Sequence, residues 1–217
     1  MRKLRIPKRS DHPIVKDNLT HFYHIPVLRS FFIKRLTMTL DLFENKKFNN
    51  ILEVGFGSGV LLHELTQIAS DVHACDIHEH IDEVKKLTEQ EGLKVHLKHG
   101  NILTLPYEDN QFDAIISVAV IEHIHGLEKA ISELKRVLKP GGMLALGFPY
   151  ESKITDFLLT AAGSTKAYRQ KLREIHPNSH ADIIQETGKQ FLEVKAQRFP
   201  PYFPEWGTLY CSLSAVK

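Results

Sequence analysis

The chain has 217 residues, of which 42% are hydrophobic and 25% are charged, and its formal net charge is +2. This usage is typical of one globular domain with an elaboration and excludes a mainly disordered chain. The small net charge does not favour nucleic acid as a partner of the whole domain. Apolar runs are too short to span a bilayer, so no membrane partner is expected. The two cysteines, Cys75 and Cys211, lie in apolar stretches, which favours reduced thiols and a cytoplasmic protein.

The N-terminal region is predicted to form a helical cap or lid over residues 1–48. Basic residues gather in the first nine positions, where a solvated tail is expected and contact with phosphate is the alternative. Residues 21–43 then carry aromatic and aliphatic side chains at helical spacing, with Pro26 near the helix start. We expect this helix to pack beside a ligand site.

Between residues 50 and 148, short aliphatic runs alternate with longer amphipathic stretches, which is the pattern of βαβ units and a parallel sheet. Helices are predicted to begin near Ser58, Glu79 and Leu127, with Ser58 as the cap of the first. The third helix, over 127–138, carries an apolar stripe, and residues 139–142 are expected to end it and turn into a strand. The predicted strands of this core cover 51–54, 71–75, 94–97, 114–118 and 143–148.

The C-terminal part is predicted to add two helices and two strands. The helices cover 154–174 and 181–187, with Gly188 closing the second, and the strands cover 191–199 and 207–216 as a hairpin-like edge. The sequence thus predicts an α/β fold with a doubly wound, mostly parallel seven-stranded sheet and an antiparallel closing strand. The main domain is expected over 49–217, with a helical insertion at about 150–190.

Three glycines follow the first predicted strand in the heptapeptide EVGFGSG at 53–59. Gly55, Gly57 and Gly59 allow the backbone to turn tightly and to approach a ligand where a Cβ would collide. A dinucleotide fingerprint requires glycine at position 60, where this chain has Val60. The spacing therefore favours a cofactor other than a nicotinamide dinucleotide.

The heptapeptide resembles the first motif of the class I S-adenosylmethionine-dependent methyltransferases, close to the type 11 methyltransferase domains. Segments similar to the later motifs follow in the expected order and cover roughly half of the chain: GNI at 100–102, LPYEDNQFDAIIS at 105–117, VIEHI at 120–124 and LKPGGM at 138–143. The resemblance implies a Rossmann-like methyltransferase fold and S-adenosyl-L-methionine as cofactor, with S-adenosyl-L-homocysteine as product.

The resemblance also implies which residues contact the cofactor. Asp76, at the end of the second strand, is expected to accept hydrogen bonds from the ribose hydroxyls, and Ile77 to flank the adenine. Asn101 is expected to hold the adenine edge, although a turn-forming role is the alternative. The full set of expected cofactor contacts is Glu53, Gly55, Phe56, Gly57, Gly59, Asp76, Ile77, Asn101, Ile102 and Ala119.

A sulfonium cofactor carries an activated methyl group, so the protein mainly has to align an acceptor and exclude water. If the acceptor needs a base, His123 beyond the fourth strand is the candidate catalytic residue. The tetrapeptide [Asn/Asp]-Pro-Pro-[Tyr/Phe], which marks many methylases of base and glutamine amines, is missing there. We therefore expect a small-molecule acceptor.

Three alternatives remain open at this stage: a scaffold that binds the cofactor without transfer, a nicotinamide oxidoreductase, and an RNA or protein methyltransferase. No metal site is expected, although the chain has thirteen histidines. The pairs His78/His80, His123/His125 and His176/His180 lack a carboxylate or cysteine at a recognised ligand spacing, and Pro177 interrupts the last pair.

Overall fold

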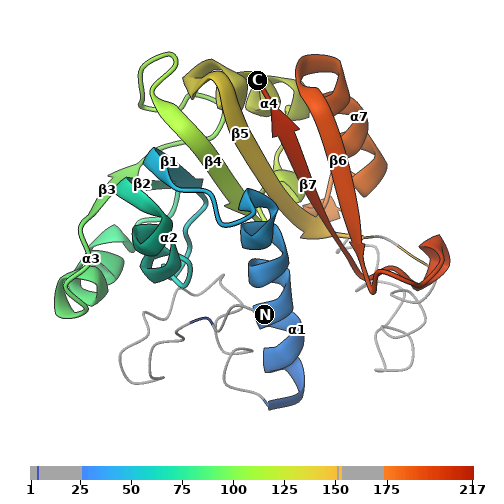
Figure 1. The fold of residues 1–217 in the computed structure, drawn as a ribbon, viewed down its shortest axis with the longest axis horizontal. Helices are drawn as coiled ribbons and strands as arrows, with labels where there is room; N and C mark the ends of the chain where they lie inside the picture. The colour runs from blue at the N-terminus through green and yellow to red at the C-terminus, as the bar shows by residue number, and fades with distance from the viewer. Residues whose placement is uncertain (1–3, 5–25, 151, 153–173) are drawn as a thin grey trace.

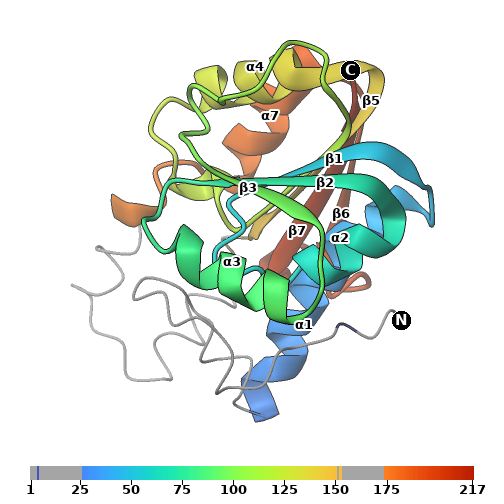
Figure 2. The same ribbon diagram turned by 90° about the vertical axis from the view of Figure 1, so that its left-hand side faces the viewer.

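A single sheet, flanked by helices on both faces, forms the framework of the computed structural model (Figure 1). The structure describes residues 4, 26–150, 152 and 174–217. Helices α1 (Pro26–Leu40), α2 (Leu62–Ile68) and α3 (Ile81–Gln90) cover one face, and α4 (Leu127–Val137) and α7 (His180–Gln190) cover the other (Figure 2). This arrangement confirms the doubly wound α/β fold.

The sheet has seven strands in the order β3-β2-β1-β4-β5-β7-β6. β7 runs antiparallel to both β5 and β6, whereas the pairs among β1 to β5 are parallel. The predicted closing hairpin is therefore confirmed, with β6 at the edge. The strands are β1 (Phe48–Val54), β2 (Ala69–Asp76), β3 (Val95–His99), β4 (Phe112–Val118), β5 (Leu138–Pro149), β6 (Leu192–Phe199) and β7 (Tyr210–Val216).

Apolar side chains fill the space on both faces of the sheet. The face under α4 and α7 holds Ile131 and Leu134 of the predicted α4 stripe together with Leu146 of β5, all fully buried. The opposite face packs Leu36 of α1 and Leu65 of α2 against the sheet. Because both faces are covered, the central strands are hydrophobic on both sides, as parallel strands usually are.

Three local predictions were wrong. Ser58 caps no helix, since α2 begins four residues later at Leu62 and its first turn has no side-chain cap. Residues 139–142 belong to β5, which begins directly after α4, instead of forming a separate turn. Gly188 lies inside α7, which continues to Gln190 because packing of the helix outweighs the weak helix propensity of one glycine.

Several predicted regions lie wholly or partly outside the described residues. These are the basic N-terminal cluster, the first part of the 21–43 helix, and the helix expected over 154–174 apart from residue 174. Short 3-10 turns complete the described elements: η2 (Asp41–Phe43), η3 (Ile121–His123) and η4 (Glu205–Gly207). Among the described residues, none of the helices is both long and apolar enough to cross a membrane.

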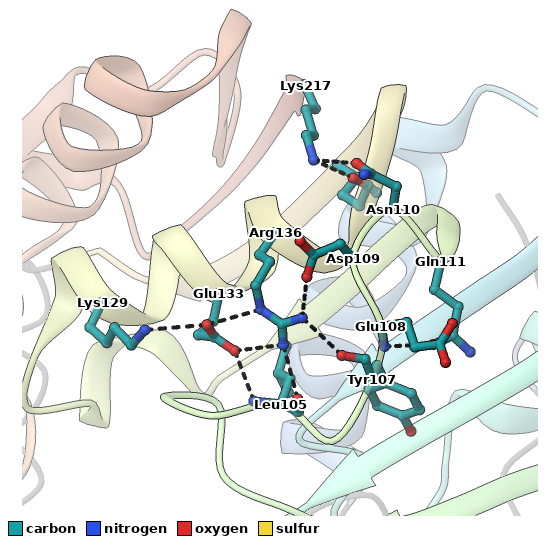
Figure 3. A network of polar contacts seen from close by, with 11 residues as sticks. Leu105, Tyr107, Glu108, Asp109, Asn110, Gln111, Lys129, Glu133, Arg136 and Lys217 are labelled. Carbon is teal, nitrogen blue, oxygen red and sulfur yellow. Dashed lines mark hydrogen bonds and ion pairs between the residues drawn. The ribbon is translucent and has the colours of Figure 1, made fainter.

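A polar network fixes the segment that leads into β4 (Figure 3). Arg136 of α4 contacts both carboxylate oxygens of Glu133, at 2.9 and 3.1 Å, and Asp109 at 2.7 Å. It also donates to the carbonyls of Leu105 and Tyr107, at 3.0 and 2.9 Å. Glu133 accepts the amide of Leu105 at 3.0 Å, so this buried carboxylate is fully engaged. The network therefore positions β4, whose carboxyl end bears part of the site described below.

We expect Arg136→Met to lower the free energy of unfolding by about 2–4 kcal/mol, because it leaves the buried Glu133 carboxylate without its main partner. Urea unfolding at pH 7 measures the change. Lys129→Met is the control, since its exposed ion pair with Glu133 is worth less than about 1 kcal/mol. Equal unfolding midpoints for wild type and Arg136→Met would show that the network adds no stability.

The same network makes a prediction about pH. The hydrogen bond from Arg136 is the main cause that lowers the pKa of Glu133 below its usual value. The stability that this pair provides is therefore present above the usual pKa of glutamate and is lost as the pH falls through the lowered value. The difference between wild type and Arg136→Met should accordingly shrink in acid.

Candidate functional site

A cavity of about 650 Å³ opens at the carboxyl ends of β1, β2 and β4. Strand order reverses between β1 and β4, and ligands of open α/β sheets bind at such a switch point. Of the residues predicted from the sequence, those that line it are Glu53, Gly55, Phe56, Gly57, Asp76, Ile77, Ala119 and His123. Gly59, Asn101 and Ile102 are not among the described residues that line it.

The glycine turn after β1 forms the floor of the cavity. Gly55, Gly57 and Gly59 all have positive φ, at 80°, 51° and 77°. A Cβ on Gly55 would lie 2.1 Å from a methyl carbon of Val120, so only glycine fits between the ends of β1 and β4. Gly59 has a different role, because a Cβ there would meet Val84 of α3 at 2.9 Å. It permits helix packing behind the turn.

Asp76, the last residue of β2, ties the glycine turn to the end of its strand. Its Oδ2 accepts the amide of Gly57 at 2.7 Å, and its Oδ1 accepts the amides of Ile77 and His78 at 2.7 and 3.2 Å. A carboxylate has about four lone-pair sites, so three protein contacts leave roughly one for a ligand. Asp76 is therefore part of the scaffold of the turn as well as a wall of the cavity.

His78 is a site residue that the sequence reasoning did not assign. Its Nε2 donates to the carbonyl of Gly57 at 2.8 Å, and its Nδ1 accepts the amide of His80 at 3.1 Å. Both ring nitrogens are thus engaged, which fixes the neutral tautomer with the proton on Nε2. The only sequence signal for this role is its position two residues after Asp76.

Glu53 is a buried carboxyl at the end of β1 that faces the cavity. Its Oε2 has no hydrogen-bond partner among the described residues. Burial, and secondarily the negative charge of Asp76, raises the pKa of Glu53 to about 8. An unpaired buried carboxyl next to an open cavity is suited to receive a cation or a hydrogen-bond donor from a ligand.

Ala119 and the residues around it form the wall of the cavity on the β4 side. Ala119 has φ 58°, a conformation that is strained for a residue with a Cβ. Its amide donates to the carbonyl of Gly147 at 2.8 Å, and Ser117 donates from Oγ to the carbonyl of Val54 at 2.8 Å. These bonds hold the ends of β1, β4 and β5 together and keep the bend at Ala119.

His123 lies in η3 at the rim of the same cavity, and the position of its ring is well defined. Its Nδ1 lies 2.8 Å from the carbonyl oxygen of Ile175, so Nδ1 carries the proton and Nε2 is the basic nitrogen. The ring packs edge-on against His176 at 4.5 Å between centroids. Burial lowers the pKa of His176 to about 4, so this second ring is neutral at neutral pH.

Two charged residues near His123 were missed by the sequence reasoning. Glu122 is buried, its Oε2 has no partner among the described residues, and burial raises its pKa. Arg35 of α1 lines the cavity, with its guanidinium carbon 4.9 Å from the centre of the Phe32 ring. The only sequence signal for Arg35 was a positive charge within the apolar segment 21–43. The direction in which its side chain points depends on how α1 packs, which the sequence does not show.

Asn101 adopts the turn-forming alternative that the sequence left open. Its Oδ1 accepts the amide of Leu103 at 2.9 Å, and its carbonyl accepts the amide of Thr104. This closes a short turn after β3 of the kind that asparagine favours. Ile102 is buried in the core on the side of α4.

Comparison with known proteins gives a consistent result. Residues 52–146 match the family model of a methyltransferase domain. A sterol 24-C-methyltransferase of Gibberella zeae is 34% identical over 110 residues, which cover 49% of this chain and 28% of that protein. A ubiquinone biosynthesis O-methyltransferase of Roseobacter denitrificans is 24% identical over 72% of this chain and 66% of its own length. The chain thus spans between about a quarter and two thirds of these curated relatives.

A solved structure with the same fold contains the expected cofactor. The phosphoethanolamine N-methyltransferase 2 of Haemonchus contortus, in complex with S-adenosyl-L-methionine, matches 85% of this chain and 52% of its own with a TM-score of 0.65 and 16% identity. At this identity the likeness shows the fold alone. Residues 52–146 are therefore similar to a methyltransferase domain, and the fold of this segment agrees with that likeness.

Proposed function

We propose that this protein binds S-adenosylmethionine in the cavity at the β1/β4 switch point and transfers its methyl group to a small-molecule acceptor. The observation that carries the proposal is the unpaired, buried Glu53 carboxyl at the end of β1, which lines the same cavity as Gly55 and Gly57 of the glycine turn. S-adenosylmethionine supplies a methyl group already activated on a sulfonium, so the chain has only to bind and orient.

The residues present fit this cofactor. Glu53 is placed to receive the ammonium of the methionine part, and the remaining lone pair of Asp76 to accept a ribose hydroxyl. Ile77 is exposed at the cavity and offers an apolar surface for the adenine. The side chain of Asn101 accepts a hydrogen bond within its own turn. For Asn101 and Ile102 we therefore propose only that their backbone supports the edge of the adenine.

The acceptor is proposed to bind between η3 and α1. His123 presents its Nε2 there, and Arg35 lines the same part of the cavity with a positive guanidinium. The carboxyl of Glu122 is buried next to His123, and burial favours its neutral form. In this proposal residues 1–48 act as a cap, with Phe32, Arg35 and Leu36 of α1 forming its cavity wall. The small-molecule substrates named for the relatives support this acceptor class. A cytoplasmic location remains a prediction, supported by the two free, buried cysteines.

Calorimetry tests the cofactor. We expect S-adenosylmethionine and S-adenosylhomocysteine to bind with one site per chain and NADH not to bind. Asp76→Ala should weaken the affinity for S-adenosylhomocysteine by about 1.5–3 kcal/mol, because a charged acceptor is lost. Asp82→Ala on the exposed side of α3 is the control. Melting curves of both variants separate loss of binding from loss of the turn, and binding of NADH alone would contradict the proposal.

The raised pKa of Glu53 predicts how the stability of the protein depends on pH. A carboxyl whose pKa is about 8 in the folded chain and near 4.5 in the unfolded chain costs stability as the pH rises between these values. Glu53→Gln should therefore match wild type near pH 4.5 and be more stable at pH 7, by on the order of 3 kcal/mol. Urea unfolding at both pH values measures this. A constant difference would contradict the raised pKa.

Glu53 also links pH to cofactor affinity. An ammonium group favours the ionised carboxylate, so binding of S-adenosylhomocysteine should release a proton from Glu53 near pH 7 and tighten as the pH rises towards 8. Calorimetry in two buffers with different enthalpies of ionisation counts the protons released. Wild type should show release and Glu53→Gln should not; equal release in both would remove Glu53 from the cofactor site.

The acceptor class and His123 are tested with methyl-labelled S-adenosylmethionine. Incubation with a desalted small-molecule extract, with RNA and with protein should transfer label to the small-molecule fraction, and label in a macromolecule would contradict the proposal. If His123 acts as base, His123→Gln should slow transfer by roughly a hundred-fold or more. His125→Gln, on the exposed neighbouring histidine, is the matched control and should retain the wild-type rate.

A further inference from the structure

A cluster of metal-ligand side chains lies on β2 and β3, away from the carboxyl ends of the strands where the cavity opens. Asp71 is the third and His73 the fifth of the eight residues of β2, and His96 lies on β3, where it is the register partner of His73. Asp71 lies five residues and His73 three residues before Asp76 along β2, which corresponds to roughly 16 and 10 Å. The cluster is therefore separate from the proposed methyl-transfer site.

The three side chains converge on one point. The Nε2 of His73 lies 3.1 Å from Oδ2 of Asp71, and the Nε2 of His96 lies 3.0 Å from its Oδ1. The two imidazole rings are stacked, with centroids 4.7 Å apart and planes inclined by 27°. One possible ligand atom from each residue lies within 4.8 Å of the other two.

We propose that Asp71, His73 and His96 bind a divalent transition-metal ion of the zinc class. Two imidazole nitrogens and a carboxylate oxygen are an established donor set for such ions. Tetrahedral coordination at bond lengths of about 2.0–2.1 Å places neighbouring ligand atoms roughly 3.3 Å apart, close to the distances seen here. The side chains of Asp71 and His96 are 44% and 63% exposed, so they can adjust, and water can complete the coordination.

His73 is the fixed member of the set. Its side chain is only 13% exposed, and the rings of Tyr107 and Phe112 pack edge-on against it at 5.8 and 5.3 Å. Burial lowers its pKa, so the ring is neutral at neutral pH, which is the form that binds metal. Because His73 and His96 are register partners, an ion bound by both would bridge the neighbouring strands β2 and β3.

One positive charge opposes the ion. Lys98 acts electrostatically on His73 from β3, and its ammonium is held 3.3 Å from the carbonyl of Pro106 and over the ring of Tyr107. The site is therefore expected to bind metal less tightly than the same ligands without this lysine. Replacing Lys98 should therefore strengthen metal binding, whereas replacing a ligand residue should weaken it.

Calorimetry with Zn²⁺ on the chelator-treated full chain tests the proposal. Wild type should show one saturable site, and His96→Gln and Asp71→Asn should each weaken it by about ten-fold or more. Lys98→Met should tighten it. His63→Gln, which removes a histidine paired with Glu64 on α2, is the matched control and should leave the affinity unchanged.

Two further measurements keep the result interpretable. Co²⁺ should give the visible absorption of a low-symmetry site in wild type and His63→Gln, and lose it in His96→Gln. Melting curves without metal should agree for wild type and His96→Gln, because His96 is mostly exposed. Absence of a saturable Zn²⁺ site in wild type, or equal affinity in wild type and His96→Gln, would overturn the proposal.

Discussion

The hydrogen bond from the amide of Gly57 to Asp76 is the contact on which the site depends. It joins the turn after β1 to the end of β2, while Asp76 also holds the first two amides that follow it. A loop of three glycines with positive φ has high conformational freedom, so it needs such an anchor to present a defined surface. The glycine turn is therefore held by Asp76, together with the contact of His78 with the carbonyl of Gly57.

The wall of the cavity on the β4 side depends on a strained backbone and on close packing. Ala119 is bent into a strained conformation at the end of β4, and Val120 fills the space that a side chain on Gly55 would occupy. The polar network around Arg136 fixes the segment before β4, so the strand enters the sheet in one register. The bend at Ala119 itself is held by the bonds of Ala119 and Ser117 to the neighbouring strands.

Ionisable side chains are distributed unevenly around the cavity, so its two ends differ in chemistry. The protonatable Glu53 lies beside the glycine turn, where a cofactor cation is proposed, whereas His123 and Arg35 lie at the end that is closed by η3 and α1. The cluster of Asp71, His73 and His96 is a third ionisable centre, which lies on β2 and β3 away from the cavity. Binding at the cluster and binding at the cavity are therefore expected to be separable by substitution.

The sequence by itself determined the succession of strands and helices along the core, the glycine turn and the acid at the end of β2, because these features depend on local spacing and on the alternation of strands and helices. The order of the strands within the sheet came from the structure. It did not determine that Ser58 caps no helix, since the start of α2 depends on how the turn packs. Only the tertiary structure brought Arg35 to the cavity and His96 beside His73. Such contacts depend on helix orientation and strand register, which residues distant in the chain decide together.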